Sequence, residues 1–373
     1  NRIVGNNTGL LGSTGGQGTR SFENNWWGCN EGPSDSDCDS VIGSEDYDPW
    51  LVLSMSATPG YVVPNANNAV TADFVHNSNG LNVGPGFPDG NSVGFSTTAG
   101  SVTPTSDTTS SGAAETTLTA PSQKIPVTVT GSFDNAATPL TLKVQADITV
   151  NDDTSGSGPA GSTCATPDYS TITAAVTVAE SGSEILICEG TYDEQFTVNE
   201  KLDFKGAGSG TIIGNTSGIS DKNQVTLGDG STGTTFEDLT ISSRAQSFGF
   251  TAVRTASGNQ PVNDVSFNNV TVRGLGPTTP GTGAFGVFVD DPADNWSFND
   301  FEAADFYFGI EVQGDATDMT IVNSIFHNNR IGLDTTKTTP LGPGSTGEIV
   351  GLDVSNTDFA NNEYRGLYFE GLG

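Results

Sequence analysis

Residues 298–333 read FNDFEAADFYFGIEVQGDATDMTIVNSIFHNNRIGL and contain one short pattern twice. Phe298-Asn299-Asp300 returns as Ile321-Val322-Asn323, so an apolar residue is followed two positions later by Asp or Asn, and the copies lie 23 residues apart. A second pattern, Gly followed by alternating apolar residues, recurs over the same interval, from Gly309 to Gly332. Two strand-like patterns per period predict a solenoid whose coils bury their apolar side chains against the coils above and below.

Both patterns extend through the C-terminal half of the chain. The steps between the polar members of the first pattern are 31, 31, 23 and 33 residues, which indicates coils with insertions on one face. A β-sandwich with alternating strands is the alternative, and the period shared by two independent patterns favours the solenoid. We expect the polar members to form a hydrogen-bonded ladder along the axis, as stacked side chains do in cross-β structures. These ladder residues, with one from the N-terminal segment, are Asn24, Asp238, Asn269, Asp300, Asn323 and Asn356.

Residues 164–373 resemble the right-handed parallel β-helix superfamily of pectate-lyase-like and copper-binding-protein-like surface proteins. The resemblance rests on YSTITAAV at 169–176, SGSEILICEGTYDEQFTV at 181–198 and LDFKGAGSGTIIGN at 202–215. In that superfamily an amphipathic helix caps the first coil. Independently, Ile172, Ala175, Val176 and Ala179 fall on one helical face. The resemblance therefore implies an all-β right-handed parallel β-helix over 164–373, with a capping helix and a linker before it at 151–163.

Residues 1–50 look like the terminal coils of the same fold. The segment NRIVGNNTGL at 1–10 matches residues 323–333, and Phe22-Glu23-Asn24 repeats the first pattern 23 residues after Asn1. Because an open strand edge is a template for pairing, we expect this segment to complete the open coil of a neighbouring copy, head to tail, and so to build a filament. Folding back onto its own chain, and excision from a longer tandem protein, are the alternatives. The expected interface residues are Asn1, Ile3, Leu10, Phe22, Trp26 and Trp27 on the donor side and Tyr364, Leu367, Phe369 and Leu372 on the acceptor side.

Residues 51–150 contain six strand-length runs separated by turn clusters, a pattern typical of an Ig-like sandwich. The segments AVTADFVHNSNG at 69–80, PDGNSVGFSTTAGSVTP at 88–104 and GAAETTLTAP at 112–121 resemble bacterial Ig-like domains of invasin and intimin type. That resemblance implies a spacer or adhesive module, and a spacer without a ligand is the expectation, since the fold alone carries no specific function.

The composition limits the partners. The chain of 373 residues has 13 Lys+Arg against 44 Asp+Glu and a net charge of −31, which argues against nucleic acid and anionic membranes as partners. No apolar run is long enough for membrane insertion, and because the first residue is Asn1 we expect a mature or excised product.

The cysteines indicate an oxidising, extracellular or cell-surface location. They form two local pairs, Cys29 with Cys38 and Cys164 with Cys188, for which disulfides are expected and a metal site is the alternative. Sequons that permit glycosylation in a secreted protein begin at Asn6, Asn215, Asn269 and Asn295.

Many β-helix proteins cleave acidic polysaccharides, so the chain has to be considered as an enzyme. The candidate residues are Asp290-Asp291, Asp294, Arg254, Arg273 and His327. We expect Asp290-Asp291 to cap a solvated turn and His327 to occupy a turn beside a ladder residue. The sequence therefore predicts no catalytic residue, no certain cofactor and no enzyme. Calcium binding by the acidic runs at 35–37, 44–46 and 151–153 stays open.

The function expected from these features is that of a structural filament subunit whose partners are copies of itself. A polysaccharide-binding adhesin or polysaccharide-degrading enzyme, which would contact a glycan or cell surface, is the alternative.

Overall fold

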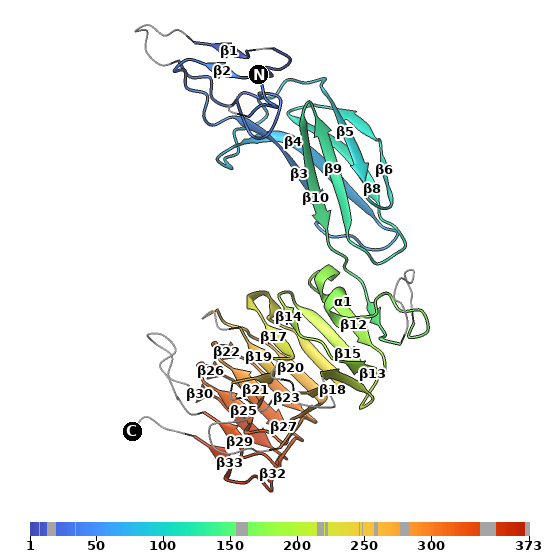
Figure 1. The fold of residues 1–373 in the computed structure, drawn as a ribbon, viewed down its shortest axis with the longest axis vertical. Helices are drawn as coiled ribbons and strands as arrows, with labels where there is room; N and C mark the ends of the chain where they lie inside the picture. The colour runs from blue at the N-terminus through green and yellow to red at the C-terminus, as the bar shows by residue number, and fades with distance from the viewer. Residues whose placement is uncertain are drawn as a thin grey trace. The chain divides into compact units, whose positions relative to one another are not determined.

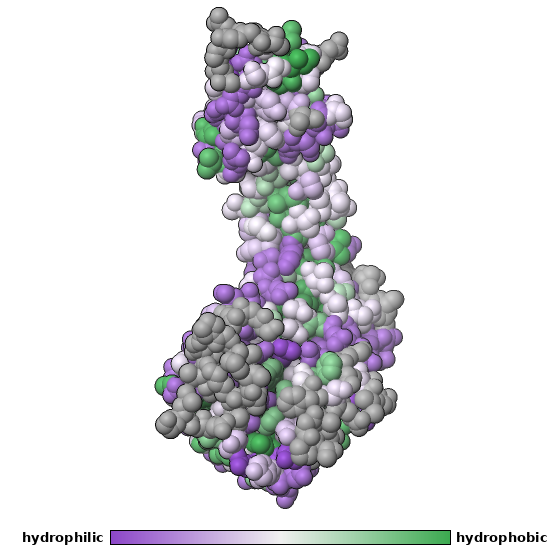
Figure 2. Space-filling model, turned by 60° about the vertical axis from the view of Figure 1, so that its left-hand side comes forward, coloured by the Kyte–Doolittle hydropathy of each residue, from purple (hydrophilic) through white to green (hydrophobic). Residues whose placement is uncertain are grey.

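The computed structural model describes the chain except Asn7, residues 13–19, Ser34, residues 154–162, 215–219 and 221–222, Gln246, Phe248 and residues 257–259, 277–283, 336–347 and 370–373. The chain is nearly all β and divides into two compact units, Asn1–Val144 and Gln145–Gly373 (Figure 1). On the face drawn in Figure 2 the described surface is mostly hydrophilic or intermediate, with apolar residues in small groups. No helix in the described ranges is long and apolar enough to span a membrane.

The second unit is a parallel β-helix, which confirms that prediction. Its strands form three sheets in which every neighbouring pair runs parallel, and the coils follow one another from green through yellow to red in Figure 1. The first sheet contains β11 (Ile148–Val150), β12 (Ser183–Ile187), β13 (Gly190–Tyr192), β15 (Leu202–Gly206), β16 (Thr211–Gly214), β18 (Thr235–Ser242), β20 (Ser266–Arg273), β23 (Ser297–Asn299), β24 (Glu302–Ala304), β27 (Thr320–Val322), β28 (Ile325–His327), β31 (Asp353–Ser355) and β32 (Asp358–Ala360). The second contains β14 (Phe196–Val198), β17 (Val225–Leu227), β19 (Thr251–Thr255), β21 (Phe285–Val289), β25 (Phe308–Val312), β29 (Ile331–Asp334) and β33 (Arg365–Tyr368). The third contains β22 (Ala293–Asp294), β26 (Ala316–Thr317) and β30 (Ile349–Val350), and a 3-10 turn, η1, spans Asp229–Ser231.

A stack of phenylalanines, one from each of four successive coils, runs through the core. Phe204, Phe236, Phe267 and Phe298 stack with ring centroids 5.0, 5.2 and 5.0 Å apart and nearly parallel planes. These spacings are close to the distance of about 4.8 Å between neighbouring strands, so each ring lies directly over the next. The predicted helix, α1 (Ile172–Val178), buries Ile172 and Ala175 against this core, and the Thr171 hydroxyl accepts from the Ala174 N–H at its start.

A glycine column explains the second sequence pattern. A Cβ built on Gly286, Gly309 or Gly332 would lie within 2.5 Å of the carbonyl oxygen of the matching glycine in the next coil. The backbones of neighbouring coils approach each other too closely there for any side chain, so the recurring Gly is a packing requirement.

The asparagine ladder exists and includes the predicted pairs Asn323–Asn356 and Asp238–Asn269, while Asn268 and Asn299 replace Asn269 and Asp300 in its middle. The amides of Asn299, Asn323 and Asn356 donate to the side-chain oxygen of Asn268, Asn299 and Asn323 at 2.8, 3.0 and 2.7 Å. Asn269 donates to Asp238 at 2.6 Å, whereas Asn24 accepts from Asn77 of the first unit and Asp300 accepts from its sequence neighbour Asn299. All six predicted residues also share a left-handed backbone, with φ between 48° and 54°, that Asn and Asp tolerate at corners.

The first unit contains two four-stranded antiparallel sheets packed face to face through Phe74, Phe87 and Phe133. One consists of β3 (Leu51–Thr58), β4 (Asn67–Asn77), β6 (Ser101–Thr103) and β8 (Ala113–Thr119), the other of β5 (Ser92–Thr97), β7 (Ser106–Thr108), β9 (Val127–Phe133) and β10 (Ala136–Leu142). The predicted boundary at residue 150 lies too late in the sequence, because β11 already pairs with β12 in the β-helix.

Residues 1–50 make two successive turns of chain that pair in parallel at three places: Arg2 with Trp26, β1 (Leu10–Leu11) with β2 (Val41–Ile42), and Ser21 with Asp46. Trp26 and Trp27 are completely buried, and the Trp26 indole donates to Asp134 and packs edge-on against Phe74. The prediction that Trp26 and Trp27 lie at an open interface between copies was therefore wrong. Trp26 instead packs the second turn of residues 1–50 against the antiparallel sheets. Ile3, Leu10 and Phe22 stay half-buried, and Leu372 lies outside the described residues.

Candidate functional site

The outer face of the second parallel sheet carries an unusual row of side chains. Arg254, Phe288, Glu311, Asp334 and Tyr368 are successive register partners across β19, β21, β25, β29 and β33. Their sequence neighbours Val253, Val287, Ile310 and Leu333 lie in the core, so alternation along each strand directs this row outward. Adjacent members are about 4.8 Å apart along the stack. We call Glu311 and Asp334, together with Asp290 at the end of β21, the acidic row.

Asp290 and Asp291 lie against the preceding coil. Arg254 Nη2 donates to Asp290 Oδ2 at 3.1 Å, and the Thr255 hydroxyl accepts from the N–H groups of both aspartates at 2.8 and 3.0 Å. The expectation of a solvated turn was wrong, because Asp291 is only 2% exposed and the Asp290 side chain only 8%. Burial raises the pKa of Asp290, although Arg254 opposes the shift.

Glu311 is the most deeply buried member of the acidic row, with 0% exposure. Its Oε1 accepts from Gln313 Nε2 at 2.5 Å, and its Oε2 has no hydrogen-bond partner in the described part of the chain. Burial, reinforced by the negative charges of Asp334 and Asp290, raises the pKa of Glu311 to about 8. At neutral pH this side chain is therefore mainly a neutral carboxylic acid beside the buried Asp334.

Neither Glu311 nor Asp334 was among the site residues predicted from the sequence. A signal was present: each is the second residue after a column glycine, in Gly309-Ile310-Glu311 and Gly332-Leu333-Asp334. Equal spacing from a shared register point places two acids on adjacent rungs of one outward row.

Beside this row lies a stack of alternating tyrosines and arginines, which we call the tyrosine–arginine stack. The Arg330 guanidinium lies over the rings of Tyr307 and Tyr364, at 5.2 and 5.4 Å from their centroids. Arg365 lies over Tyr364 at 4.5 Å and over Tyr368 at 3.7 Å. Tyr368 is also the register partner of Asp334, so the stack adjoins the acidic row.

The stack and the acidic row are joined by a small apolar cluster outside the main core. Phe285, Phe288, Phe308 and Ile331 form it, and Tyr307 and Tyr368 pack against it. Arg254 lies over the Phe288 ring at 5.6 Å. Aromatic, basic and acidic side chains therefore make one continuous cluster, which is buried at Glu311 and Asp334 and exposed at Tyr364.

A different face carries the other two catalytic candidates. Glu302 Oε1 accepts from Arg273 Nη2 at 2.7 Å and contacts His327 Nε2 at 3.0 Å, at one end of a groove in the first sheet that Arg244 also lines. Burial would raise the pKa of Glu302, but the bonds from His327 and Arg273 outweigh it and lower the pKa. His327 lies in β28, so its placement in a turn was wrong. Asp294 hydrogen-bonds Thr317 on the neighbouring coil, away from both groups.

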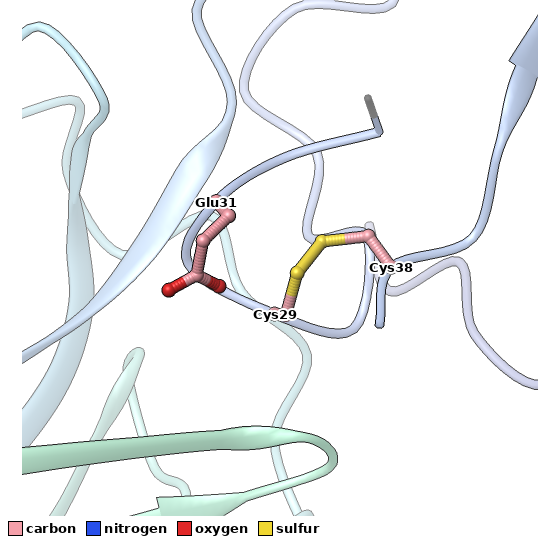
Figure 3. A group of neighbouring side chains, drawn as sticks. All are labelled: Cys29, Glu31 and Cys38. Carbon is pink, nitrogen blue, oxygen red and sulfur yellow. A yellow bond between two sulfur atoms is a disulfide. The ribbon is translucent and has the colours of Figure 1, made fainter. Parts of the chain in front are cut away.

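Both predicted disulfides, Cys29–Cys38 and Cys164–Cys188, are present. Among the described residues, Cys29, Glu31 and Cys38 are the one group of potential metal ligands that converge, and Figure 3 shows the two sulfurs bonded together with the Glu31 carboxylate beside them. Sulfurs in a disulfide are not thiolate ligands, so this group does not support a metal site. The acidic runs proposed for calcium gain no support from it either.

Three of the four sequon asparagines use their side-chain amides as hydrogen-bond donors to an aspartate. Asn6 donates to Asp39, Asn269 to Asp238 and Asn295 to Asp264, each from an exposed residue. Asn215 lies outside the described residues. Glycosylation stays a prediction.

No protein-family model matches the chain, and no curated protein matches it. Two solved structures are similar, both of the pectin methylesterase from Aspergillus niger, one in deglycosylated form and one in penultimately deglycosylated form with an N-acetylglucosamine stub. Each is 15% identical and covers 61% of this chain and 91% of the other, with TM-scores of 0.27 and 0.25.

These comparisons correct one expectation. The sequence predicts that the chain is not an enzyme, whereas both matched structures are of one enzyme, named as a pectin methylesterase. At 15% identity and TM-scores of 0.27 and 0.25, this likeness does not indicate which substrate the chain acts on. Neither matched structure is named as an Ig-like or invasin-type protein, so that part of the resemblance remains a prediction.

Proposed function

We propose that this chain is an extracellular β-helix protein that binds a polysaccharide along the outer face of its second sheet. The observation that carries the proposal is the tyrosine–arginine stack, which is continuous with the acidic row. The two disulfides support an oxidising compartment. The antiparallel sheets of the first unit then serve as an Ig-like spacer.

The stack has the chemistry that sugar binding needs. The guanidinium groups lie over the ring faces, so the exposed ring edges and the tyrosine hydroxyls are the parts of the stack that can contact the C–H groups and hydroxyls of a sugar. Arginine donors in a fixed planar array suit hydroxyl or carboxylate oxygens of a sugar. Tyr364 is 58% exposed and therefore accessible to a ligand. In a chain with 13 Lys+Arg against 44 Asp+Glu, two arginines between three tyrosines form a local basic site in an acidic surface.

Calorimetric titration with neutral and uronic-acid oligosaccharides tests the proposal. Tyr364→Ala removes the ring between two guanidinium groups, so we expect binding to weaken by about threefold to tenfold, equivalent to roughly 1 kcal/mol. Tyr61→Ala, in the first unit, is the matched control. Equal affinities of Tyr364→Ala and the unmodified chain, or no binding of any oligosaccharide, would reject the stack as a binding site.

A second candidate function is head-to-tail assembly by β-helix complementation between copies. One observation favours it: Leu367 is 42% exposed on β33, whereas its register partner Leu333 on β29 is fully buried. The turn of chain at 1–24, which begins with the same pattern and carries half-buried Ile3 and Leu10, has the form of a coil that covers such a surface. In this reading the partners are other copies of the chain.

Native mass spectrometry and electron microscopy of the full chain test assembly. We expect polymers that Leu367→Glu and Ile3→Glu each abolish, because a carboxylate is placed between stacked coils. Leu81→Glu, at an exposed leucine of the first unit, is the control. Monomers from the unmodified chain across a wide concentration range would remove this candidate and leave sugar binding unaffected.

A further inference from the structure

We infer that the groove on the outer face of the first sheet, in which Arg244, Arg273 and Glu302 lie, binds a sugar unit that carries an oxyanion, either a carboxylate or a sulfate ester. We call it the first-sheet groove. It is a different site from the tyrosine–arginine stack, so the inference goes beyond the proposed function and stands without it. Three features of the groove support it: its shape, its charge and its mixture of hydrogen-bond donors and acceptors.

The shape of the first-sheet groove comes from four successive rungs. Ile212, Thr240, Thr271 and Glu302 are register partners across β16, β18, β20 and β24, so this row spans roughly 14 Å along the axis. The next residue on each of these strands is buried in the core, which directs the row outward. The groove has a volume of about 380 Å³, within the range of about 300–1,000 Å³ that is typical of small-ligand sites. It is therefore large enough for a sugar unit.

The first-sheet groove is basic in a chain that is otherwise strongly acidic. Among the described residues that line it, Arg244 and Arg273 stand against one carboxylate, that of Glu302. The whole chain has the opposite balance, with 13 Lys+Arg against 44 Asp+Glu. The Arg273 side chain is 53% exposed, and its bond to Glu302 uses Nη2, one part of a group with five donors. A local positive field with planar guanidinium donors selects an oxyanion.

The mixture of donors and acceptors indicates a sugar rather than a simple ion. Hydroxyl groups of Ser209, Thr240 and Thr271 line the groove beside the arginines. Glu302 adds an acceptor, and its Oε2 lies 3.5 Å from the Thr271 hydroxyl. An inorganic anion such as sulfate has no proton to donate, so the carboxylate would repel it. A sugar hydroxyl donates as well as accepts, so a charged sugar can place its oxyanion on the arginines and a hydroxyl on Glu302.

His327 provides a readout that is specific to this groove. Its Nε2 lies 3.0 Å from Glu302 Oε1, and the other of the two histidines in the chain, His76, belongs to the first unit. A chain labelled with ¹³C at the histidine Cε1 atoms should give two NMR signals, which His76→Gln assigns. We expect the His327 signal to move on titration with a glucuronic-acid oligosaccharide or a sulfated oligosaccharide, and the His76 signal to stay in place.

Substitutions in the groove test which side chains bind the ligand. Arg273→Gln removes a charge-assisted hydrogen bond and should weaken binding of the charged oligosaccharide by about tenfold or more. Arg244→Gln leaves the contacts of Glu302 in place and should weaken binding as well. Lys205→Gln is the matched control, because it removes the same charge from β15 of the same sheet, where Lys205 pairs with Glu237 outside the groove. This control should keep the affinity of the unmodified chain.

The outcomes separate this site from the tyrosine–arginine stack. A response of His327 to either charged oligosaccharide supports the inference and identifies the group that carries the charge. An equal response to a neutral oligosaccharide of the same length, or to inorganic sulfate, overturns the assignment of a charged sugar. A His327 signal that no ligand moves, or full affinity in both arginine variants, overturns the site. Tyr364→Ala should keep the His327 response, so failure of either site leaves the other intact.

Discussion

Replacing Glu311 with Gln should change how the stability of the β-helix depends on pH. The pKa of Glu311 is about 8 in the folded chain against an ordinary 4.5, because burial disfavours the charged form. Between pH 4.5 and about pH 8, Glu311 therefore stays protonated in the folded chain but is ionised in the unfolded chain. The free energy of unfolding must fall as pH rises through that window and level off above the folded pKa.

The size of the effect follows from the shift. Each pKa unit corresponds to about 1.4 kcal/mol, so the full shift amounts to roughly 5 kcal/mol between acidic and mildly alkaline pH. Gln cannot ionise, so Glu311→Gln should lack this loss. We expect the variant to match the unmodified chain near pH 5 and to be more stable by several kcal/mol near pH 8.5.

Hydrogen exchange of peptides that cover β25 and β29 measures this in the β-helix alone, after correction for the intrinsic pH dependence of exchange. Protection of these peptides should fall with pH in the unmodified chain and stay nearly level in Glu311→Gln. The control Glu363→Gln alters an exposed carboxylate and should behave like the unmodified chain. Identical pH dependence of protection in all three proteins would refute the protonated state of Glu311.

Three further predictions concern the solenoid. Gly309→Ala places a Cβ 2.5 Å from the Gly332 carbonyl oxygen and should destabilise the β-helix by about 1–3 kcal/mol in urea unfolding, whereas Gly86→Ala meets open space and should change little. Phe267→Ala removes a ring stacked between Phe236 and Phe298 and should cost about 3–5 kcal/mol in the same assay; a loss below about 1 kcal/mol would contradict the stacked core. Replacing both Cys164 and Cys188, which are separated by 24 residues, with Ser should lower stability by roughly 3 kcal/mol, and unchanged unfolding would show that the bridge does not constrain the chain.

Much of the fold was predictable because a β-helix repeats a local pattern. The column glycines, the Phe stack, the capping helix and both disulfides follow from spacing along the chain. In a parallel stack of coils, equal register in sequence becomes vertical alignment in space. The same regularity made the left-handed corners visible as recurring Asn and Asp, although the hydrogen bonds between coils pass through Asn268 and Asn299.

The sequence by itself determined the period of the solenoid, the residues that point into its core and the pairing of its cysteines, because these depend on neighbours at fixed separations. Only the tertiary structure decided that Trp26 is buried against the antiparallel sheets, that Asp290 is bound by Arg254 and that Glu311 shares a buried row with Asp334. Burial and the protonation of a carboxyl depend on every group packed around it. Those groups arrive from coils whose contents vary, so their combined field exists only after the coils have stacked.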